Sequence, residues 1–171
     1  MAEYDPVGIL RVLHNHRVRF VVIGGVAARL RGAPLITQDL DVTPAADRAN
    51  LRALAEALTA LGARLRTPKE PDGVSFPITA EMLAAADAWT LITSRGDLDL
   101  AFTPDGTGGY RDLAASSDML QVSDDPPLRV SVASLADVIR SKEAAGRAKD
   151  RAAMPLLRQT LEEVERANGP S

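Results

Sequence analysis

Apolar residues recur every three or four positions in three stretches of the chain, which is the spacing of a helix with one buried face. These stretches are residues 6–16, 44–61 and 135 onward. Thr43 and Pro44 fit the N-cap and the first turn of the second helix, and Gly62 fits its C-terminal end. Because proline lacks an amide hydrogen, we expect Pro155 to divide the third stretch into two helices.

Runs of β-branched or alternating apolar residues predict strands. They cover residues 17–23, 37–42, 89–93, 98–102, 119–122 and 128–132. In the second run Leu40 and Val42 share one face, whereas Asp39 and Asp41 share the other. Short helices are expected over 26–30 and 79–86, and a proline-rich loop between 67 and 78. Together these elements predict an α/β (α+β) fold with a mixed β-sheet flanked by helices.

Composition narrows the possible functions. The 171 residues are 46% hydrophobic and 25% charged and include no cysteine, which excludes a disulfide scaffold, a thiolate zinc site and a cysteine nucleophile. The net charge of −3 gives no general attraction to nucleic acid. No apolar run approaches membrane-spanning length, and the N-terminal residues carry no basic segment. We therefore expect a cytoplasmic protein with no membrane partner.

Three aspartates stand in predicted strands, where aspartate is disfavoured. Asp39 and Asp41 leave the same strand face with α-carbons roughly 6.5–7 Å apart, and Asp99 interrupts an apolar run. If the two strands are neighbours, three carboxylates converge, a cluster that fits Mg²⁺ or Mn²⁺. The alternative is that they are ordinary solvent-facing residues. Gly24 and Gly25 follow a strand and open a helix, where backbone N–H groups can bind phosphate.

The last helical stretch carries basic residues. Lys142 falls on the apolar stripe, where it either reaches the surface along its aliphatic stem or points into a cleft to bind phosphate. Lys149 lies seven residues further on. Arg147 and Asp150 are spaced to form an i, i+3 ion pair.

These residues resemble a known signature. Residues 21–27 (VVIGGVA), followed by Gly32, Thr37 and Asp39-Leu40-Asp41, resemble the nucleotidyltransferase (DNA polymerase β-like) superfamily, and more closely its small bacterial AbiEii-type members. Further similarity lies in residues 50–63, 98–100 and 142–150, so that it covers residues 18–158. The chain departs from the pattern at Leu35, where many relatives have arginine.

The resemblance implies a nucleotidyltransferase fold whose C-terminal helices close a cleft. It also implies transfer of a nucleoside monophosphate from an NTP to a hydroxyl of a tRNA, a protein or a small molecule, within a toxin–antitoxin pair. The resemblance implies that the residues that bind Mg²⁺ or Mn²⁺ and carry out catalysis are Asp39, Asp41 and Asp99. It implies that the nucleotide is bound by Gly24, Gly25, Thr37, Lys142 and Asp150. The alternative is a non-catalytic binding module or antitoxin with the same fold.

The expected organisation is a catalytic core over residues 1–133, a helical segment over 134–166 packed on the same domain, and a frayed tail over 167–171. A tRNA acceptor needs a local basic patch because the overall charge is negative. The sequence offers candidates for it at Arg29, Arg31, Arg64, Arg66 and Lys69.

Overall fold

Seven strands form one mixed sheet in the order β3-β4-β5-β2-β1-β7-β6. The structure is a computed structural model that describes residues 3–169. The strands are β1 (Phe20–Ile23), β2 (Asp39–Pro44), β3 (Arg64–Leu65), β4 (Ala88–Thr93), β5 (Gly96–Ala101), β6 (Asp118–Asp124) and β7 (Pro127–Val132). The pairs β1–β7 and β2–β5 are parallel, whereas the other neighbouring pairs are antiparallel.

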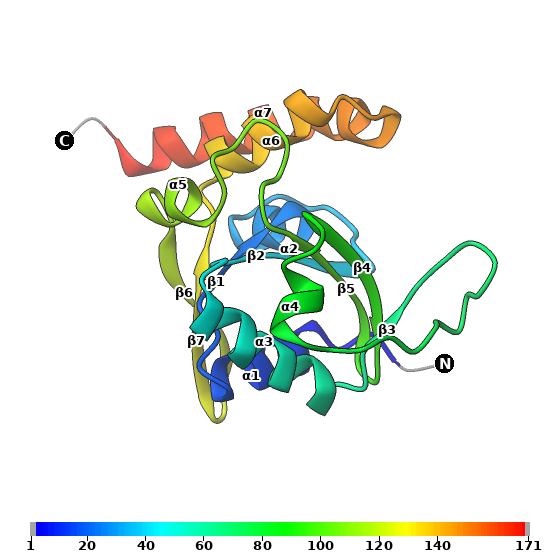
Figure 1. Cartoon of the computed structure of the whole chain (residues 1–171). Helices are drawn as coiled ribbons and strands as arrows, with labels where there is room; N and C mark the ends of the chain where they lie inside the picture. Colours follow the sequence, from blue (N-terminus) through cyan, green and yellow to red (C-terminus); the bar gives the residue numbers. More distant parts are fainter. Residues whose placement is uncertain (1–2, 170–171) are drawn as a thin grey trace.

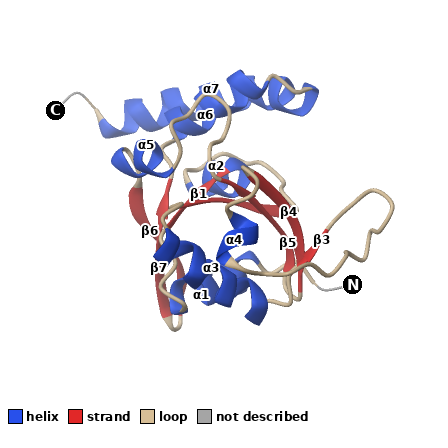
Figure 2. Cartoon of the chain, viewed as in Figure 1, coloured by secondary structure: helices blue, strands red, loops and turns tan. Residues whose placement is uncertain are grey.

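Helices cover both faces of this sheet, which is strongly curved (Figures 1 and 2). They are α1 (Pro6–Asn15), α2 (Gly24–Leu30), α3 (Arg48–Ala60), α4 (Ala80–Leu83), α5 (Tyr110–Ala115), α6 (Leu135–Ala145) and α7 (Ala148–Asn168). The helices α1, α3 and α4 lie inside the arch of the sheet, and α2, α5, α6 and α7 lie outside it. The predicted α/β architecture with a mixed, helix-flanked sheet is therefore confirmed.

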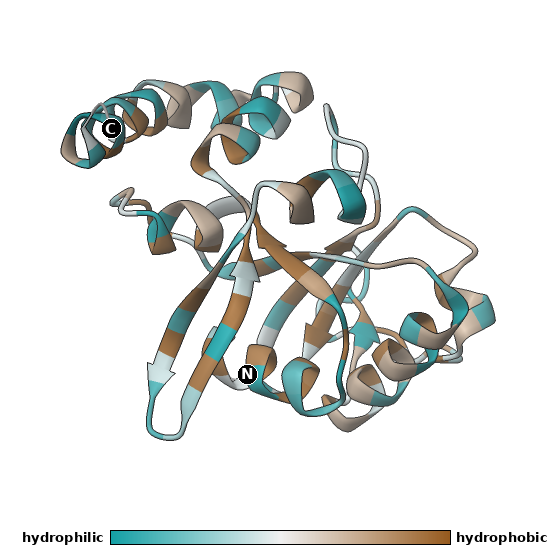
Figure 3. Ribbon diagram, turned by 90° about the vertical axis from the view of Figure 1, so that its left-hand side faces the viewer, coloured by the Kyte–Doolittle hydropathy of each residue, from teal (hydrophilic) through white to brown (hydrophobic). Residues whose placement is uncertain are grey.

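The strands alternate between a core face and a polar face. Leu40 and Val42 of β2 are fully buried, as are Leu98 and Leu100 of β5. The residues between them are only partly buried and include all three predicted carboxylates. In Figure 3 the hydrophobic residues concentrate along the strands, whereas α7 carries many hydrophilic ones. The alternation places polar chemistry on the face of the sheet that looks toward α6 and α7.

The start of α3 differs from the prediction. Thr43 and Pro44 belong to β2, where they pair with Val21 and Phe20 of β1. The helix begins only at Arg48, and the N-cap is Asp47, whose carboxylate accepts a hydrogen bond from the Asn50 amide at 3.2 Å. Pairing with the buried strand β1 therefore outweighs the local preference of threonine and proline for a helix start.

The break between the last two helices also differs from the prediction. It falls at Gly146, which has the left-handed φ of 62° that favours glycine, and Pro155 lies inside α7. Proline removes the amide that would bond the Arg151 carbonyl. Because Pro155 and Arg151 are both exposed, a water molecule can donate a hydrogen bond to the Arg151 carbonyl. The helix can therefore continue through Pro155.

Smaller differences concern short elements and the chain end. The sequence did not indicate α5 or the two-residue β3. Helix α7 continues to Asn168, so residues 167 and 168 of the expected tail are helical, and residues 170–171 lie outside the described part. Over residues 3–169, no helix has the combined length and apolarity needed to cross a membrane.

Candidate metal and nucleotide site

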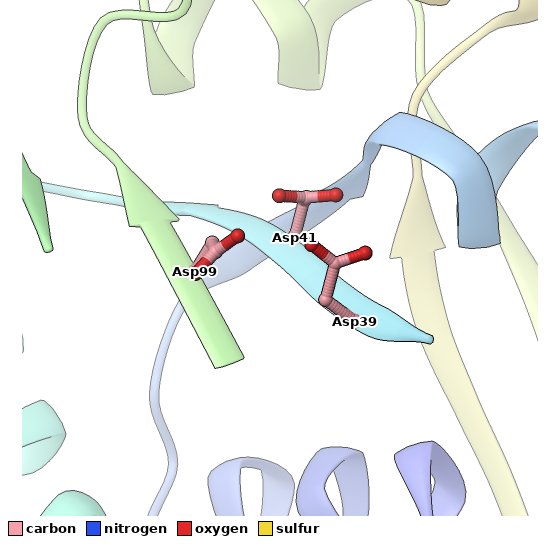
Figure 4. Close-up of side chains that lie close together, drawn as sticks. All are labelled: Asp39, Asp41 and Asp99. Carbon is pink, nitrogen blue, oxygen red and sulfur yellow. The ribbon is translucent and has the colours of Figure 1, made fainter. Parts of the chain in front are cut away.

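Three carboxylates converge on the polar face of the sheet. Strands β2 and β5 are parallel neighbours, with Asp41 opposite Asp99 and Asp39 opposite Asp97. Asp39, Asp41 and Asp99 each offer an oxygen, and these oxygens lie within 4.8 Å of one another. Figure 4 shows the three side chains pointing toward one another from the two strands. The strand register alone brings these three side chains together.

The clustering disturbs the ionisation of two of these carboxylates. Burial, together with the charges of Asp39 and Asp99, raises the pKa of Asp41 to about 7. Burial and the neighbouring Asp39 raise the pKa of Asp99 to about 6. In addition, Asp99 Oδ1 is buried and has no hydrogen-bond partner within residues 3–169. Such a cluster favours either bound protons or a cation that neutralises it.

Arg66 pairs with Asp99, the third carboxylate of the cluster, a role that was not predicted from the sequence. Its Nη1 lies 2.6 Å from Asp97 Oδ2, and its Nη2 lies 3.5 Å from Asp99 Oδ1. A hydrogen bond from the Arg66 amide to the Thr90 carbonyl fixes the backbone beside β4. Its position could not be predicted because it follows the short strand β3, which has no clear sequence signal.

Glycine is required where the backbone approaches the carboxylates. A Cβ on Gly24 would lie 2.4 Å from Asp41 Oδ2, and the residue has a φ of +67°. A Cβ on Gly25 would lie 3.0 Å from Thr37. The Thr37 hydroxyl donates to the Asp39 carbonyl at 3.0 Å and so anchors the start of β2. The two glycines therefore allow the first turn of α2, which has no side-chain cap, to lie directly against the carboxylates.

Basic side chains line the cavity from α6, from α7 and from Arg147, the N-cap residue of α7. Lys142, Arg147 and Lys149 line the same cavity of about 640 Å³ as the three aspartates. Lys142 is 18% exposed, and its Nζ lies 3.5 Å from Asp150 Oδ1. Arg147 is 61% exposed, and its Nε lies 2.7 Å from Asp150 Oδ2. We call the three carboxylates on the sheet the acidic wall of the cavity, and the three cations on the opposite side its basic wall; Asp137 of α6, which pairs with Arg140, also lines the cavity.

Asp150 occupies a different place from the other predicted site residues. Its side chain is 0% exposed, and it does not line the cavity. Burial opposes its ionisation, but the hydrogen bonds and charge of Arg147 and the charge of Lys142 outweigh it and hold the pKa of Asp150 below its usual range. Asp150 therefore orients two cations and has no surface with which to touch a nucleotide.

Two neighbouring apolar residues, Leu35 and Ile36, line the cavity. Leu35 lines the cavity and is partly buried, and its neighbour Ile36 is 92% exposed. Neither side chain can donate a hydrogen bond to phosphate. The cations of the cavity come from α6 and α7 instead.

Most residues of the basic patch expected for tRNA form ion pairs or hydrogen bonds with other residues of this protein. Arg31 pairs with Asp118 and donates to the carbonyls of Val132 and Ala133. Arg64 donates to the Gly73 carbonyl at 2.8 Å, and Arg66 pairs with two aspartates. Three of the five candidate cations are therefore committed to structural contacts.

Comparison with known proteins identifies the fold. No protein-family model matches the chain, and no curated protein matches it. Among solved structures, it is similar to the crystal structure of a "putative nucleotidyltransferase" from Thermotoga maritima, with a TM-score of 0.54 and 17% sequence identity. The match covers 95% of this chain and 97% of the other. The two chains share a nucleotidyltransferase-like fold over nearly their whole length.

Proposed function

We propose that this protein is a metal-dependent nucleotidyltransferase that transfers a nucleoside monophosphate from an NTP to an acceptor hydroxyl and releases pyrophosphate. One observation carries the proposal: three carboxylates from two neighbouring strands face three cations across a single cavity. An acidic wall suits a divalent cation, and a basic wall suits a polyphosphate. The shared fold agrees with this chemistry.

The carboxylates fit a small hard cation. Magnesium prefers oxygen ligands such as carboxylates. The three carboxylate oxygens lie within 4.8 Å of one another, so side-chain rotation could bring them onto one ion. Asp39, Asp41 and Asp99 would hold the ion. When bound, Mg²⁺ or Mn²⁺ would supply positive charge that stabilises the negative charge developing on the phosphates during the reaction.

The remaining groups suit the triphosphate and the acceptor. Lys142, Arg147 and Lys149 would contact phosphate oxygens, and Asp150 keeps the first two oriented. Gly24 and Gly25 line the cavity at the first turn of α2, which has no side-chain cap, and their amides would add hydrogen bonds to phosphate. Asp99 would complete the metal site or accept the proton of the acceptor hydroxyl. The raised pKa of Asp99 would make this carboxylate a better proton acceptor.

A non-catalytic binding module is the second candidate, and Leu35 favours it. An apolar side chain in the cavity, where relatives of the resembled family carry arginine, removes one phosphate ligand. The two candidates differ in a simple assay. Calorimetry of NTP binding with and without Mg²⁺ tests the site, and transfer of an α-phosphate label tests catalysis. Metal-dependent binding without transfer to any acceptor of the native cells favours the module.

A toxin–antitoxin role is a narrower proposal, and it rests on the AbiEii-type resemblance of the sequence. If the protein is the toxin, its induced expression should stop growth, and Asp41→Asn should abolish that effect. If it is the antitoxin, expression of either form should leave growth unchanged. The comparison of wild type with Asp41→Asn at equal protein levels decides between them.

A further inference from the structure

Arg66 reaches the acidic wall from the edge of the sheet. It directly follows the edge strand β3, and the hydrogen bond from its amide to the Thr90 carbonyl places it beside Thr90 of β4. Thr90 is in turn opposite Asp99 of β5. Neighbouring strands lie about 4.8 Å apart, so only a long side chain can cross β4 from this position and reach the carboxylates of β5.

The guanidinium of Arg66 holds two carboxylates of β5 unequally. Its Nη1 lies 2.6 Å from Asp97 Oδ2, a short charge-assisted hydrogen bond, whereas its Nη2 lies 3.5 Å from Asp99 Oδ1. Asp99 Oδ1 is buried and accepts no hydrogen bond within residues 3–169. Asp97 therefore anchors Arg66, and Arg66 attracts Asp99 by its charge.

Arg66 and Asp97 lie outside the space proposed for the metal ion and the nucleotide. Asp99 lines the cavity, whereas Arg66 and Asp97, both in the described part of the chain, do not. In the strand order, β5 with Asp99 stands between β3, which Arg66 follows, and β2, which carries Asp39 and Asp41. Figure 4 shows Asp99 directed toward those two carboxylates. Asp99 is thus repelled from the side of β2 and attracted from the side of β3.

We propose that Arg66 is a positioning residue of the metal site: anchored by Asp97, it holds Asp99 by Oδ1, so that the other oxygen of Asp99 stays available to the metal ion. Without this attraction, repulsion by Asp39 and Asp41 would turn Asp99 out of the cluster. The metal ion would then keep two carboxylate ligands. Arg66 itself contacts neither the metal ion nor the nucleotide. The inference rests on the proposed function.

A positioning role and a simple charge effect predict different metal affinities. If Arg66 acts only as a nearby positive charge, Arg66→Gln should tighten Mn²⁺ binding, because it removes a repelling cation. Asp97→Asn should then weaken binding, and the double variant, which has the net charge of wild type, should bind like wild type. If Arg66 positions Asp99, both single variants break the same contact and weaken binding. The double variant then loses no more affinity than one single variant.

Titration of the full chain with Mn²⁺ alone at pH 8, followed by the electron paramagnetic resonance signal of the free ion, distinguishes these cases. The variants are Arg66→Gln, Asp97→Asn, their combination, and Arg66→Lys, which keeps the charge but lacks the planar fork. Arg64→Gln is the matched control. Arg64 lies on the same edge strand, donates to Gly73 and Ser75, and pairs with no carboxylate in the described residues. The kcat and KM of labelled transfer are measured on the same preparations, each shown to be folded by circular dichroism.

We expect Arg66→Gln, Asp97→Asn and the double variant each to lose about tenfold in Mn²⁺ affinity, equivalent to about 1.4 kcal/mol. Arg66→Lys should recover part of this loss, and Arg64→Gln should bind like wild type. In the three weakened variants kcat should fall while KM for the NTP is unchanged, because Arg66 and Asp97 lie away from the basic wall.

Unchanged or tighter Mn²⁺ binding by Arg66→Gln would overturn the inference and leave the proposed function intact. A double variant that binds like wild type, or an equal loss in Arg64→Gln, would overturn it in the same way. Wild-type protein that binds no Mn²⁺, either alone or with an NTP, would contradict the proposed function itself.

Discussion

The two walls of the cavity are built in different ways. The acidic wall stands on β2 and β5, where backbone pairing sets Asp41 opposite Asp99. The basic wall stands on α6 and α7, where the fully buried Asp150 pairs with Lys142 and Arg147 beside the glycine break between the helices. Substitutions in the first wall should therefore change chemistry with little effect on folding. Substitutions at the centre of the second should change folding and binding together.

Asp99→Asn should produce the largest effect, and it should be confined to catalysis. Asparagine keeps the shape and one acceptor oxygen but cannot accept a proton. Asp39 and Asp41 remain as metal ligands, so NTP binding should stay within about tenfold, or roughly 1.4 kcal/mol. Transfer should fall by about 10²–10⁴-fold, the usual contribution of a positioned base. Labelled transfer and calorimetry on the same preparation measure both quantities. Full transfer activity in the variant would make Asp99 an ordinary strand residue.

Asp150→Asn should affect stability and binding together. It leaves Lys142 and Arg147 facing a neutral group. Because Arg147 is 61% exposed, it can turn to water, so the expected loss is about 1.5–3 kcal/mol, the usual contribution of hydrogen bonds to a charged group. Urea denaturation measures the free energy of unfolding, and calorimetry measures the accompanying loss of NTP affinity. Asp118→Asn is the control, because its pair with Arg31 has an exposed carboxylate and contributes about 1 kcal/mol or less. Equal stabilities of the two variants would contradict the role of Asp150.

Lys142→Met should weaken NTP binding and leave folding intact. Methionine suits the apolar stripe of α6, so stability should be equal or higher. Loss of a charged hydrogen-bond donor to phosphate costs about 1.5–3 kcal/mol, which calorimetry resolves. A variant that binds NTP like wild type would show that Lys142 merely extends along the helix surface to reach water.

The acidic wall should also make the stability of the protein depend on pH. This is the smallest of the four effects predicted in these paragraphs. The folded-state pKa values of Asp41 and Asp99, about 7 and 6, lie above the usual range. Their stabilising contribution is complete below about pH 4 and is lost as the pH rises through 6 to 7. Without metal, this contribution lowers Tm at pH 8 relative to pH 6, and Mg²⁺ should restore Tm at pH 8. Asp41→Asn should reduce that pH dependence. An identical Tm profile in wild type and variant would exclude Asp41 as its source.

The acidic wall could be predicted from sequence because its signal is local. Apolar and polar residues alternate along residues 37–42 and 98–102, which places the aspartates on the polar face of each strand. The sequence did not show that these two strands are neighbours, so this had to be assumed. Arg66 and the enclosure of Asp150 could not be predicted, since they depend on how a two-residue strand and a helix–helix junction pack. The start of α3 was misplaced for the same reason: Thr43 is held in β2 by its pairing with β1.

The central claim is that the three carboxylates hold a divalent metal ion. Its most direct test is a titration with Mn²⁺ at pH 8 in the presence of an NTP, in which the loss of the free-ion electron paramagnetic resonance signal measures binding. The account predicts that wild type binds Mn²⁺ and that Asp41→Asn, at the centre of the acidic wall, abolishes the binding while the protein stays folded by circular dichroism. Wild-type protein that takes up no Mn²⁺, or an Asp41→Asn variant that binds it equally well, would contradict the account.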